Sequence, residues 1–237
     1  LHVCGTWLTP LVDGALWWAD ARVLIVSDLH LEKGSSFAAA GQLLPPYDTS
    51  ATLTLVESLV QRLAPRTVIS LGDSFHDRRA ETRMSAGDTA RVRALTGAVD
   101  WVWVEGNHDP DPPEELGGRA RRELRLGPLV FRHEPTGEVG EISGHLHPAA
   151  KLVTRHKTLR RRCFACDGQR VVLPALGAFT GGLNVLDPAF GPAFPDEPPM
   201  VFAIAGGGVS MVPRGRLIMD GPRRGGGRWQ MDLSLRS

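Results

Sequence analysis

Val23-Leu24-Ile25-Val26-Ser27-Asp28-Leu29-His30 is the stretch that decides the fold, because four apolar residues lead directly into two side chains that can bind a metal. Short apolar runs of this kind are typical of buried strands. The pattern recurs where residues 67–71 lead into Asp73 and where residues 101–104 lead into Asn107-His108. In parallel α/β sheets, the loops beyond the carboxyl ends of the strands line the ligand site. The three stretches therefore predict one sheet edge at which these polar side chains meet.

The segments between these strands have the spacing of helices. In residues 49–64 the apolar side chains form an approximately helical stripe, and Pro65 follows where a helix should end. A second helix is expected near residues 86–95. Strands that alternate with helices indicate a layered α/β core.

After Pro110 the pattern changes to short strands with tight turns, which we expect at residues 128–132, 139–143, 159–165 and 170–173. Asp167-Gly168, between the last two, is a strong hairpin signal. Residues 187–199 are rich in proline and are expected to form a loop. Residues 200–205 and 209–212 are expected to form a closing hairpin around three glycines.

The composition fits a single globular domain. The chain has 237 residues, of which 42% are apolar, and no apolar run approaches the roughly 20 residues needed to cross a bilayer. Its three cysteines are an odd number, which argues against a disulfide framework and favours a reducing, cytoplasmic location. Cys163 and Cys166 form a lone Cys-x-x-Cys on an expected strand. Because residues three apart on a strand face opposite sides, packing explains this pair better than a redox or zinc motif does.

The net charge of +1 is unevenly distributed. Six arginines and two aspartates follow Pro213, which gives residues 214–237 a net charge of +4 and leaves −3 for the rest. The acidic remainder suits a cation-binding domain over residues 1–213. The basic, glycine-rich tail over residues 214–237 is expected to be flexible, with contact to nucleic acid as the alternative.

Histidines concentrate at the predicted strand ends. The chain has eight, and five of them follow predicted strands: His30, His108, His133, His145 and His147. A single histidine is more often a packed or surface residue. Five at this location, together with two aspartates and an asparagine, are better explained by metal ions, because buried polar groups cost free energy unless they are satisfied.

The candidate ligands are too numerous for one tetrahedral ion. Seven groups are available, namely Asp28, His30, Asp73, Asn107, His133, His145 and His147. If Asp73 bridges two ions, each ion receives four protein groups, and water fills the remaining positions. Mixed carboxylate and imidazole ligands suit Mn²⁺, Fe or Zn²⁺ and suit Ca²⁺ poorly. We therefore expect two divalent metal ions.

Five motifs occur in order over residues 28–147: Asp28-Leu29-His30, Gly72-Asp73, Gly106-Asn107-His108-Asp109, His133 and Gly144-His145-Leu146-His147. Together they resemble the calcineurin-like metallophosphoesterase superfamily. The resemblance implies an α/β (α+β) fold, a four-layer sandwich of two mixed β-sheets flanked by helices. It also implies that Asp28, His30, Asp73 and His147 hold one metal, and that Asp73, Asn107, His133 and His145 hold the other.

Longer stretches resemble a narrower group, the bacterial DNA-ligase-associated metallophosphoesterases. They are Asp28-Leu29-His30-Leu31-Glu32-Lys33-Gly34, Leu44-Pro45-Pro46-Tyr47-Asp48, Gly72-Asp73-Ser74-Phe75-His76-Asp77, Phe131-Arg132-His133-Glu134-Pro135 and Thr180-Gly181-Gly182-Leu183-Asn184-Val185. This resemblance implies a Mn²⁺-dependent phosphodiesterase and DNA endonuclease in DNA repair, with DNA as substrate and a functional link to ligase and helicase repair proteins.

The expected mechanism is in-line attack of a metal-bridging hydroxide on the phosphodiester. His108 is expected to act as the general acid that protonates the departing alkoxide. Asp109 is expected to orient the ring of His108 or raise its basicity. The alternative for Asp109 is a turn residue before Pro110.

Two further residues are candidate substrate ligands. His76 lies three residues after Asp73 in the same expected loop and could contact a phosphate, with a surface histidine as the alternative. Arg132 precedes His133 and on a strand would point to the opposite face. A structural salt bridge is therefore a better explanation of Arg132 than substrate binding.

Three functions stay open at this point. A nucleic acid phosphodiesterase is supported by the narrower resemblance and by basic segments around residues 119–125 and 151–162. A small-molecule or cyclic-nucleotide phosphoesterase would use the same metals, because a fold does not decide the substrate. A non-catalytic metal-binding scaffold should have lost ligands or the acid, and here all seven ligands and His108 are present.

Overall fold

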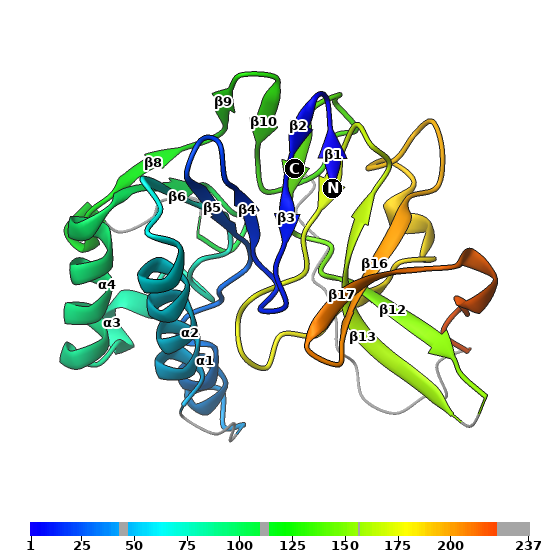
Figure 1. Cartoon of the computed structure of the whole chain (residues 1–237). Coiled ribbons are helices and arrows are strands. Elements are labelled where there is room, and N and C mark those ends of the chain that lie inside the picture. Colours follow the sequence, from blue (N-terminus) through cyan, green and yellow to red (C-terminus); the bar gives the residue numbers. More distant parts are fainter. Residues whose placement is uncertain (43–46, 110–113, 156, 222–237) are drawn as a thin grey trace, which may run out of the picture.

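Two stacked β-sheets form the centre of the molecule, and α-helices cover the outer face of one of them (Figure 1). The computed structural model describes residues 1–42, 47–109, 114–155 and 157–221. The predicted fold, with mixed sheets flanked by helices, is confirmed. None of the helices within these ranges has the length and hydropathy to span a bilayer.

The first sheet has six strands in the order β3-β4-β5-β6-β7-β8. They are β3 (Thr9–Pro10), β4 (Leu16–Trp18), β5 (Val23–Val26), β6 (Thr67–Leu71), β7 (Asp100–Val104) and β8 (Arg119–Arg121). Strands β5 to β8 run parallel to one another. The three predicted strands β5, β6 and β7 are therefore neighbours, and their carboxyl ends lie at one edge.

Four α-helices connect and cover these strands within the described residues: α1 (Lys33–Ala39), α2 (Asp48–Leu63), α3 (Ala80–Arg83) and α4 (Ala86–Ala98). Helix α2 matches the predicted helix to within one residue at each end, and it stops where Ala64 takes a left-handed φ of 46° before Pro65. Helix α4 runs three residues beyond the prediction. No glycine or proline stops it, and it ends only where Val99 becomes extended on entering β7.

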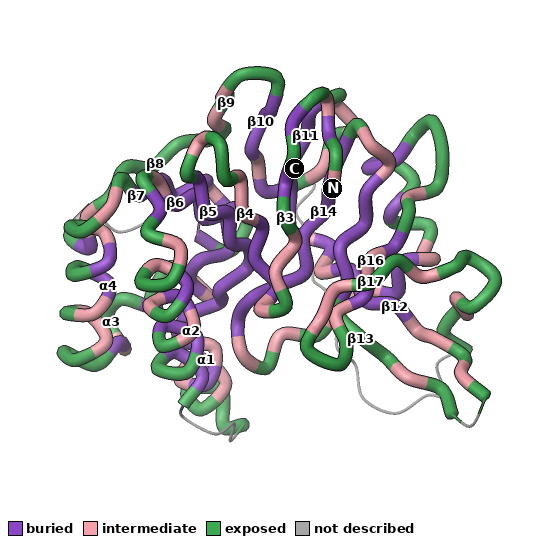
Figure 2. Tube along the Cα trace, in the orientation of Figure 1, coloured by how far each residue is buried: buried purple, intermediate pink, exposed green. Residues whose placement is uncertain are grey.

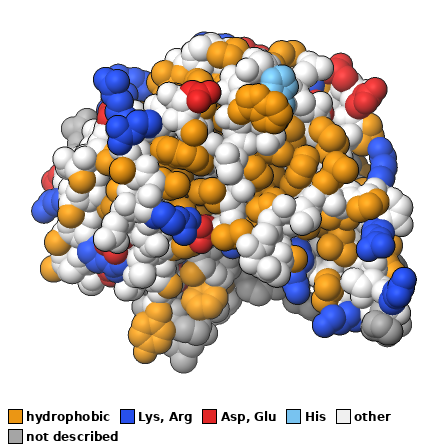
Figure 3. Space-filling view, in the orientation of Figure 1, with side chains coloured by type: hydrophobic (Ala, Val, Ile, Leu, Met, Phe, Trp, Pro, Cys, Tyr) orange, Lys and Arg blue, Asp and Glu red, His pale blue; other side chains and the backbone are white. Residues whose placement is uncertain are grey.

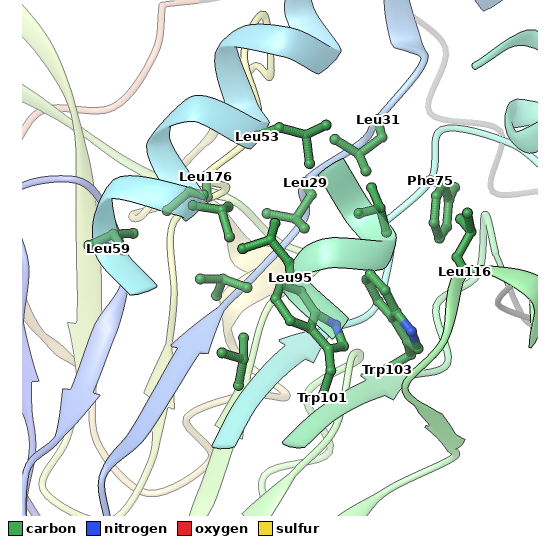
Figure 4. Packing of buried hydrophobic residues seen from close by; sticks show 14 of the residues in the cluster. Leu29, Leu31, Leu53, Leu59, Phe75, Leu95, Trp101, Trp103, Leu116 and Leu176 are labelled. Carbon is green, nitrogen blue, oxygen red and sulfur yellow. The ribbon is translucent and has the colours of Figure 1, made fainter. Parts of the chain in front are cut away.

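The helices bury their apolar stripe against one face of the first sheet (Figure 4). Leu53 and Leu59 of α2 pack there with Trp101 and Trp103 of β7. Val102, between the two tryptophans, faces the second sheet instead. The side chains that recur every 3.6 residues on the helix thus pack against those that recur every two residues on the strand, and together they form one buried layer.

The second sheet has nine strands. They are β9 (Leu124–Leu126), β10 (Leu129–Phe131), β11 (Glu141–Ser143), β12 (Pro148–Val153), β13 (Thr158–Cys166), β14 (Val171–Val172), β15 (Leu183–Asn184), β16 (Met200–Ala205) and β17 (Gly208–Val212). Strands β10, β11 and β14 are parallel, whereas β13 is antiparallel to β12, β14 and β16. Asp167-Gly168 joins β13 to β14 and β16 pairs with β17, as predicted.

The N-terminal hairpin of β1 (His2–Val3) and β2 (Thr6–Trp7) was not predicted, because two-residue strands carry no readable period. The two 3₁₀ turns η1 (Glu114–Leu116) and η3 (Arg214–Arg216) were not predicted either, because they have no clear sequence signal.

Burial changes along β13 (Figure 2): its first five residues are exposed or half-buried, and its last four are buried. Cys166 packs between the two sheets, whereas Cys163 packs on the outer face with Phe190 and Phe194. Both thiols are free and buried, and burial raises the pKa of Cys163 to about 12. The structure therefore agrees with packing rather than redox or zinc chemistry. The outer face is covered by residues 187–199, a loop with one 3₁₀ turn, η2 (Pro188–Phe190).

The chain stays packed beyond the boundary expected at residue 213. Leu217 forms a bridge with Leu152 of β12, and the amide of Ile218 donates to the carbonyl of Lys151 at 3.0 Å. Asp220 pairs with Arg160 at 2.9 Å. Residues 222–237 of the predicted flexible tail, and residues 44–46 of the sequence stretch that ends at Asp48, lie outside the described residues.

Candidate metal centre

Strand ends from both sheets hold the predicted ligands, and backbone hydrogen bonds bring neighbouring ends together. The amide of Asp28 donates to the carbonyl of Gly72 at 3.3 Å, and the amide of His30 donates to the carbonyl of Asp73 at 2.9 Å. In the second sheet, the amide of Gly144 donates to the carbonyl of His133 at 3.0 Å. Backbone hydrogen bonding between neighbouring strands thus continues into the loops that follow them, and it holds the polar residues of these loops close together.

Five of the seven candidate ligands hold left-handed backbone angles. The φ values are 53° for Asp28, 44° for His30, 45° for Asp73, 66° for His145 and 45° for His147. Residues other than glycine rarely adopt this region and keep it only where the surrounding structure enforces it. Such strain is concentrated at functional sites, and here it coincides with the predicted metal edge.

A first group of ligands consists of Asp28, His30 and His147, whose ligand atoms lie within 4.8 Å of one another. Oδ1 of Asp28 is 3.0 Å from Nε2 of His147. The carboxylate is fully buried and accepts hydrogen bonds from the hydroxyl of Ser27 and the amide of His145. Asp28 is therefore held in place by neighbours that leave an oxygen facing the histidines.

A second group gathers around His133. Its Nε2 lies 2.8 Å from Oδ1 of Asn107 and 3.2 Å from Nδ1 of His145, and that Nδ1 lies 3.1 Å from the same Asn107 oxygen. The other ring nitrogen of His133, Nδ1, donates to the carbonyl of Leu71 at 2.9 Å. This bond fixes the tautomer and leaves the lone pair of Nε2 for a metal.

Asp73 stands between the two groups. Its Oδ2 lies 3.9 Å from Nε2 of His30, and its Oδ1 lies 3.4 Å from Nε2 of His133. Asp28 also approaches the second group, since its Oδ1 is 3.9 Å from Nδ1 of His133. All seven predicted ligands are thus brought together at one edge.

The charges at this edge suit cations. Burial lowers the pKa of His30 to about 3, so its ring is neutral at pH 7 and can donate a lone pair. Burial alone would lower the pKa of His133, but the carboxylates of Asp73 and Asp28 raise it to about 9. Two buried aspartates therefore draw a positive charge into the site, and a metal ion that supplies this charge would displace the proton of His133.

A buried nitrogen of the first group makes the same point. Nε2 of His147 is buried and forms no well-aligned hydrogen bond among the described residues, although Oδ1 of Asp28 lies only 3.0 Å away. Buried polar atoms without partners are costly. A metal ion held between this nitrogen and the carboxylate would remove the cost, so the residues present fit a cation.

Two glycines allow the strand ends to approach this closely. Gly72 has a φ of 69°, and a methyl group on it would overlap the ring of His133. A methyl group on Gly106 would overlap the amide of Asp73 and a carboxylate oxygen of Asp109. These small residues are therefore part of the site although they carry no ligand atom.

His108 lies beside the ligands and reaches the surface. Its Nε2 is 3.8 Å from Oδ2 of Asp73, its amide donates to Oδ1 of Asp73 at 3.0 Å, and its side chain is 44% exposed. Nδ1 of His108 donates to the carbonyl of His76 at 3.0 Å, and the two rings stack with centroids 5.6 Å apart. Burial lowers the pKa of His76 to about 4, so His76 is a neutral neighbour at pH 7.

Asp109 does not orient the ring of His108, contrary to expectation. It is 2% exposed, and its Oδ2 accepts hydrogen bonds from the amides of Ser74 at 2.8 Å and Phe75 at 3.1 Å. These bonds tie the loop after β7 to the loop after β6. Burial and the charge of Asp73 raise the pKa of Asp109 to about 7.

Arg132 lies away from the metal edge in an ion-pair network. It donates to Thr136 at 2.7 Å and pairs with Glu123 at 2.9 Å and with Glu138. The salt-bridge interpretation from the sequence agrees with this placement. Nothing in these contacts directs the guanidinium toward a substrate.

Lys33, the first residue of α1, has a place near the site that the sequence reasoning did not assign. Its side chain is half-buried, and after burial its charge is a further cause of the lowered pKa values of His30 and His76. A cation so close to the metal edge is suited to meet a phosphate oxygen. The only available signal was its position three residues after His30.

The family model of the calcineurin-like phosphoesterases matches residues 21–170. The chain belongs to this family. It is therefore a metal-dependent phosphoesterase, and all seven candidate ligands lie within the matched residues. No curated protein matches the chain.

Two solved structures illustrate the range of similarity. The nuclease MPE of Pseudomonas putida is 30% identical, with a TM-score of 0.69, and the comparison covers 90% of this chain and 98% of that one. Yfce, a phosphoesterase from E. coli, is 16% identical, with a TM-score of 0.41, over 80% of this chain and 97% of that one.

Proposed function

We propose that this phosphoesterase is a dinuclear phosphodiesterase that cleaves nucleic acid, with DNA as the expected substrate. The observation that carries the proposal is the position of Asp73, whose two oxygens face different histidines, His30 and His133, at 3.9 and 3.4 Å. One carboxylate that faces both groups is suited to bridge two ions. Asp28, His30, Asp73 and His147 would hold one ion, and Asp73, Asn107, His133 and His145 the other.

His108 is the proposed general acid. When bound, the two cations supply a nucleophile from water at neutral pH and neutralise charge on the phosphoryl oxygens. The departing alkoxide then needs a proton. Because Nδ1 of His108 donates to the carbonyl of His76, Nε2 is the nitrogen available to a substrate bound over Asp73. Proton transfer by a positioned side chain typically contributes roughly 10²–10⁴-fold.

Two observations support nucleic acid over a small phosphoester. The similarity to the Pseudomonas putida nuclease extends over nearly the whole chain. Basic side chains also gather over the β12–β13 hairpin, at the lower right of Figure 3, where the hairpin carries Lys151, Arg155, Lys157, Arg160 and Arg161. Such side chains neutralise phosphates along a strand. Asp220 already compensates part of this charge through Lys151 and Arg160.

Four finer assignments accompany the proposal. We propose Mn²⁺ as the working metal and a role in DNA repair beside ligase and helicase proteins, both from the resemblance of the motifs. We place the enzyme in the cytoplasm, where the three free cysteines would stay reduced. His76 is the better of the two candidate substrate residues, since its ring lies beside those of His30 and His108.

Metal content and DNA cleavage, measured on the same protein, test the proposed function. The wild type should bind two Mn²⁺ per chain and cleave single-stranded DNA, with a rate that falls as salt is raised. Asp73→Ala should lose both ions and all cleavage. Asp100→Ala is the matched control, because this exposed aspartate pairs only with Arg119 among the ion pairs of the described residues.

Two results would contradict the proposal. A wild-type protein that binds a single ion at saturation would overturn the dinuclear assignment. A protein that hydrolyses mononucleotides or phosphomonoesters but leaves DNA intact would instead be a small-molecule phosphoesterase.

A further inference from the structure

Residues 176–183 connect the two turns that carry Asp28 and His147. The amide of Leu176 donates to the carbonyl of Ser27 at 2.9 Å, and the amide of Gly177 donates to the carbonyl of Asp28 at 3.1 Å. At the other end, the amide of Leu183 donates to the carbonyl of His147 at 3.1 Å. The segment is therefore anchored at both ends to residues of the first metal group. It includes most of the stretch Thr180-Gly181-Gly182-Leu183-Asn184-Val185, to which the proposed function gives no role.

Phe179 projects from the middle of this segment. The residue is 50% exposed, and its φ is 58°, a conformation that is a marked outlier for a bulky residue. The amide of Ala178 donates to the hydroxyl of Thr52 on α2 at 3.1 Å, which holds the turn in place. Because Phe179 is two residues from Gly177, its Cα lies no more than about 7 Å from the backbone contact with Asp28. The backbone that carries this exposed aromatic residue is thus tied to the turn of Asp28.

The ring borders a groove between α2 and the segment. The groove has a volume of about 360 Å³ and is lined by Ala51, Thr52 and Leu55 of α2, by residues 176–180 and by Arg162 of β13. In Figure 1 the chain after β14 loops out at this place, between α2 and the β12–β13 hairpin. The volume lies within the usual range for a small-molecule site.

Two polar groups in the groove suit a nucleotide. Arg162 donates to the carbonyls of Ala175 at 2.9 Å and Asp13 at 3.2 Å. Both of these acceptors are backbone carbonyls that position the guanidinium, and the nearby carboxylate of Asp13 is already paired with Arg62 at 2.7 Å. The hydroxyl oxygen of Thr180 is buried and has no hydrogen-bond partner among the described residues. A cation, an unpartnered hydroxyl and an exposed aromatic ring match the phosphate, the polar edge and the face of a nucleotide.

We propose that this groove holds the nucleotide next to the scissile phosphate of a single-stranded nucleic acid, with the base stacked on Phe179 and its phosphate near Arg162. The proposal rests on the proposed function, because it adds a substrate-positioning residue to a nucleic acid phosphodiesterase. Its occupant follows from charge complementarity and from the contact of residues 176–183 with the metal ligands. Phe179 thereby selects strands with accessible bases over small phosphodiesters.

Binding and cleavage by full-length, Mn²⁺-loaded variants test the proposal. Binding is measured by fluorescence anisotropy with a hydrolysis-resistant phosphorothioate oligothymidylate. Cleavage is followed with single-stranded DNA and with bis-p-nitrophenyl phosphate, which has no base. Phe179→Ala should weaken oligonucleotide binding by about 5- to 150-fold, the usual range for one lost stacking contact. It should leave kcat/KM for bis-p-nitrophenyl phosphate within about twofold, and Phe179→Trp should restore oligonucleotide binding.

Two controls make the result specific. Trp7→Ala removes another exposed aromatic, 70% exposed on β2, and should change neither measurement. An abasic oligonucleotide should bind the wild type and Phe179→Ala equally. The stacking proposal is overturned if Phe179→Ala binds the oligothymidylate as the wild type does, or if it loses both substrates equally. Failure of the proposed function would be seen separately, as a wild type that hydrolyses bis-p-nitrophenyl phosphate but not DNA.

Discussion

Gly106→Ala probes how closely the ends of β6 and β7 must approach. A methyl group at this position would overlap the amide nitrogen of Asp73 and the Oδ1 atoms of Asp73 and Asp109. The φ of Gly106 is not positive, so an alanine would meet no strain from its own backbone. The expected cost therefore comes from space alone, at the carboxylate proposed to bridge the two ions.

The size of the effect follows from these overlaps. An extra methyl group in a well-packed site typically costs about 1–3 kcal/mol. For a chain of this length, that corresponds to a fall in Tm of roughly 2–12 °C. The overlapping atoms are fixed, since Oδ1 of Asp73 accepts from the amide of His108 at 3.0 Å. Relief must come from a shift of Asp73, and a misplacement of about 1 Å at a reacting centre can cost about 10²-fold in rate.

Thermal unfolding, metal content and hydrolysis of bis-p-nitrophenyl phosphate together provide the assay. Gly97→Ala is the matched control, because a methyl group there meets no atom within 4 Å. Gly97 lies inside α4, where alanine in place of glycine is expected to stabilise by about 0.5–1 kcal/mol. The same chemical change should thus lower Tm at residue 106 and raise it at residue 97.

A tight approach of the two strand ends is refuted if Gly106→Ala unfolds at the wild-type temperature, binds two ions and keeps the wild-type rate. The space between the two strand ends would then accommodate a methyl group, contrary to the overlaps expected at Gly106. A stable protein with reduced metal content would instead locate the whole effect in the displacement of Asp73.

Two more predictions concern neighbouring residues. Asp109 holds its proton up to about pH 7 in the fold but only to about pH 4 when unfolded, so ionisation costs stability as pH rises through this window, by up to about 4 kcal/mol. In the metal-free protein, the side chain of Asp109→Asn cannot ionise, so the Tm of the variant minus that of the wild type should be larger at pH 8 than at pH 5. An equal Tm difference at both pH values would contradict the raised pKa. His108→Ala should slow DNA cleavage by roughly 10²–10⁴-fold but spare an ester whose p-nitrophenolate leaves without a proton; equal losses on both substrates, or a loss of metal, would rule out the role of general acid.

The candidate metal ligands could be identified from the sequence because their signals are local. A short apolar run followed at once by aspartate or histidine reports a buried strand and a ligand within a few residues, as at Val23–Val26 and Asp28. Parallel order then places such ends at a common edge. The hairpin at Asp167-Gly168 and the opposite faces of Cys163 and Cys166 followed from equally short patterns.

The contacts of Asp109, His76 and Phe179 were not predictable in this way. The carboxylate of Asp109 accepts hydrogen bonds from the amides of residues 74 and 75, and the carbonyl of His76 accepts one from the ring of His108. The position of Phe179 is set by the three residues before it, whose amides donate hydrogen bonds to Ser27, Asp28 and Thr52. Each of these contacts joins segments more than 30 residues apart. Sequence patterns that extend over a few residues do not predict contacts at that separation.

By itself, the sequence determined which side chains can bind metal and that they end buried strands, because residue chemistry and hydrophobic period act within a few positions. Only the tertiary structure decided which oxygen of Asp73 faces which histidine, which nitrogen of His108 is free, and which exposed aromatic residue is tied to the turn of Asp28. Those choices depend on how two sheets and their loops pack, and packing is a property of the whole chain.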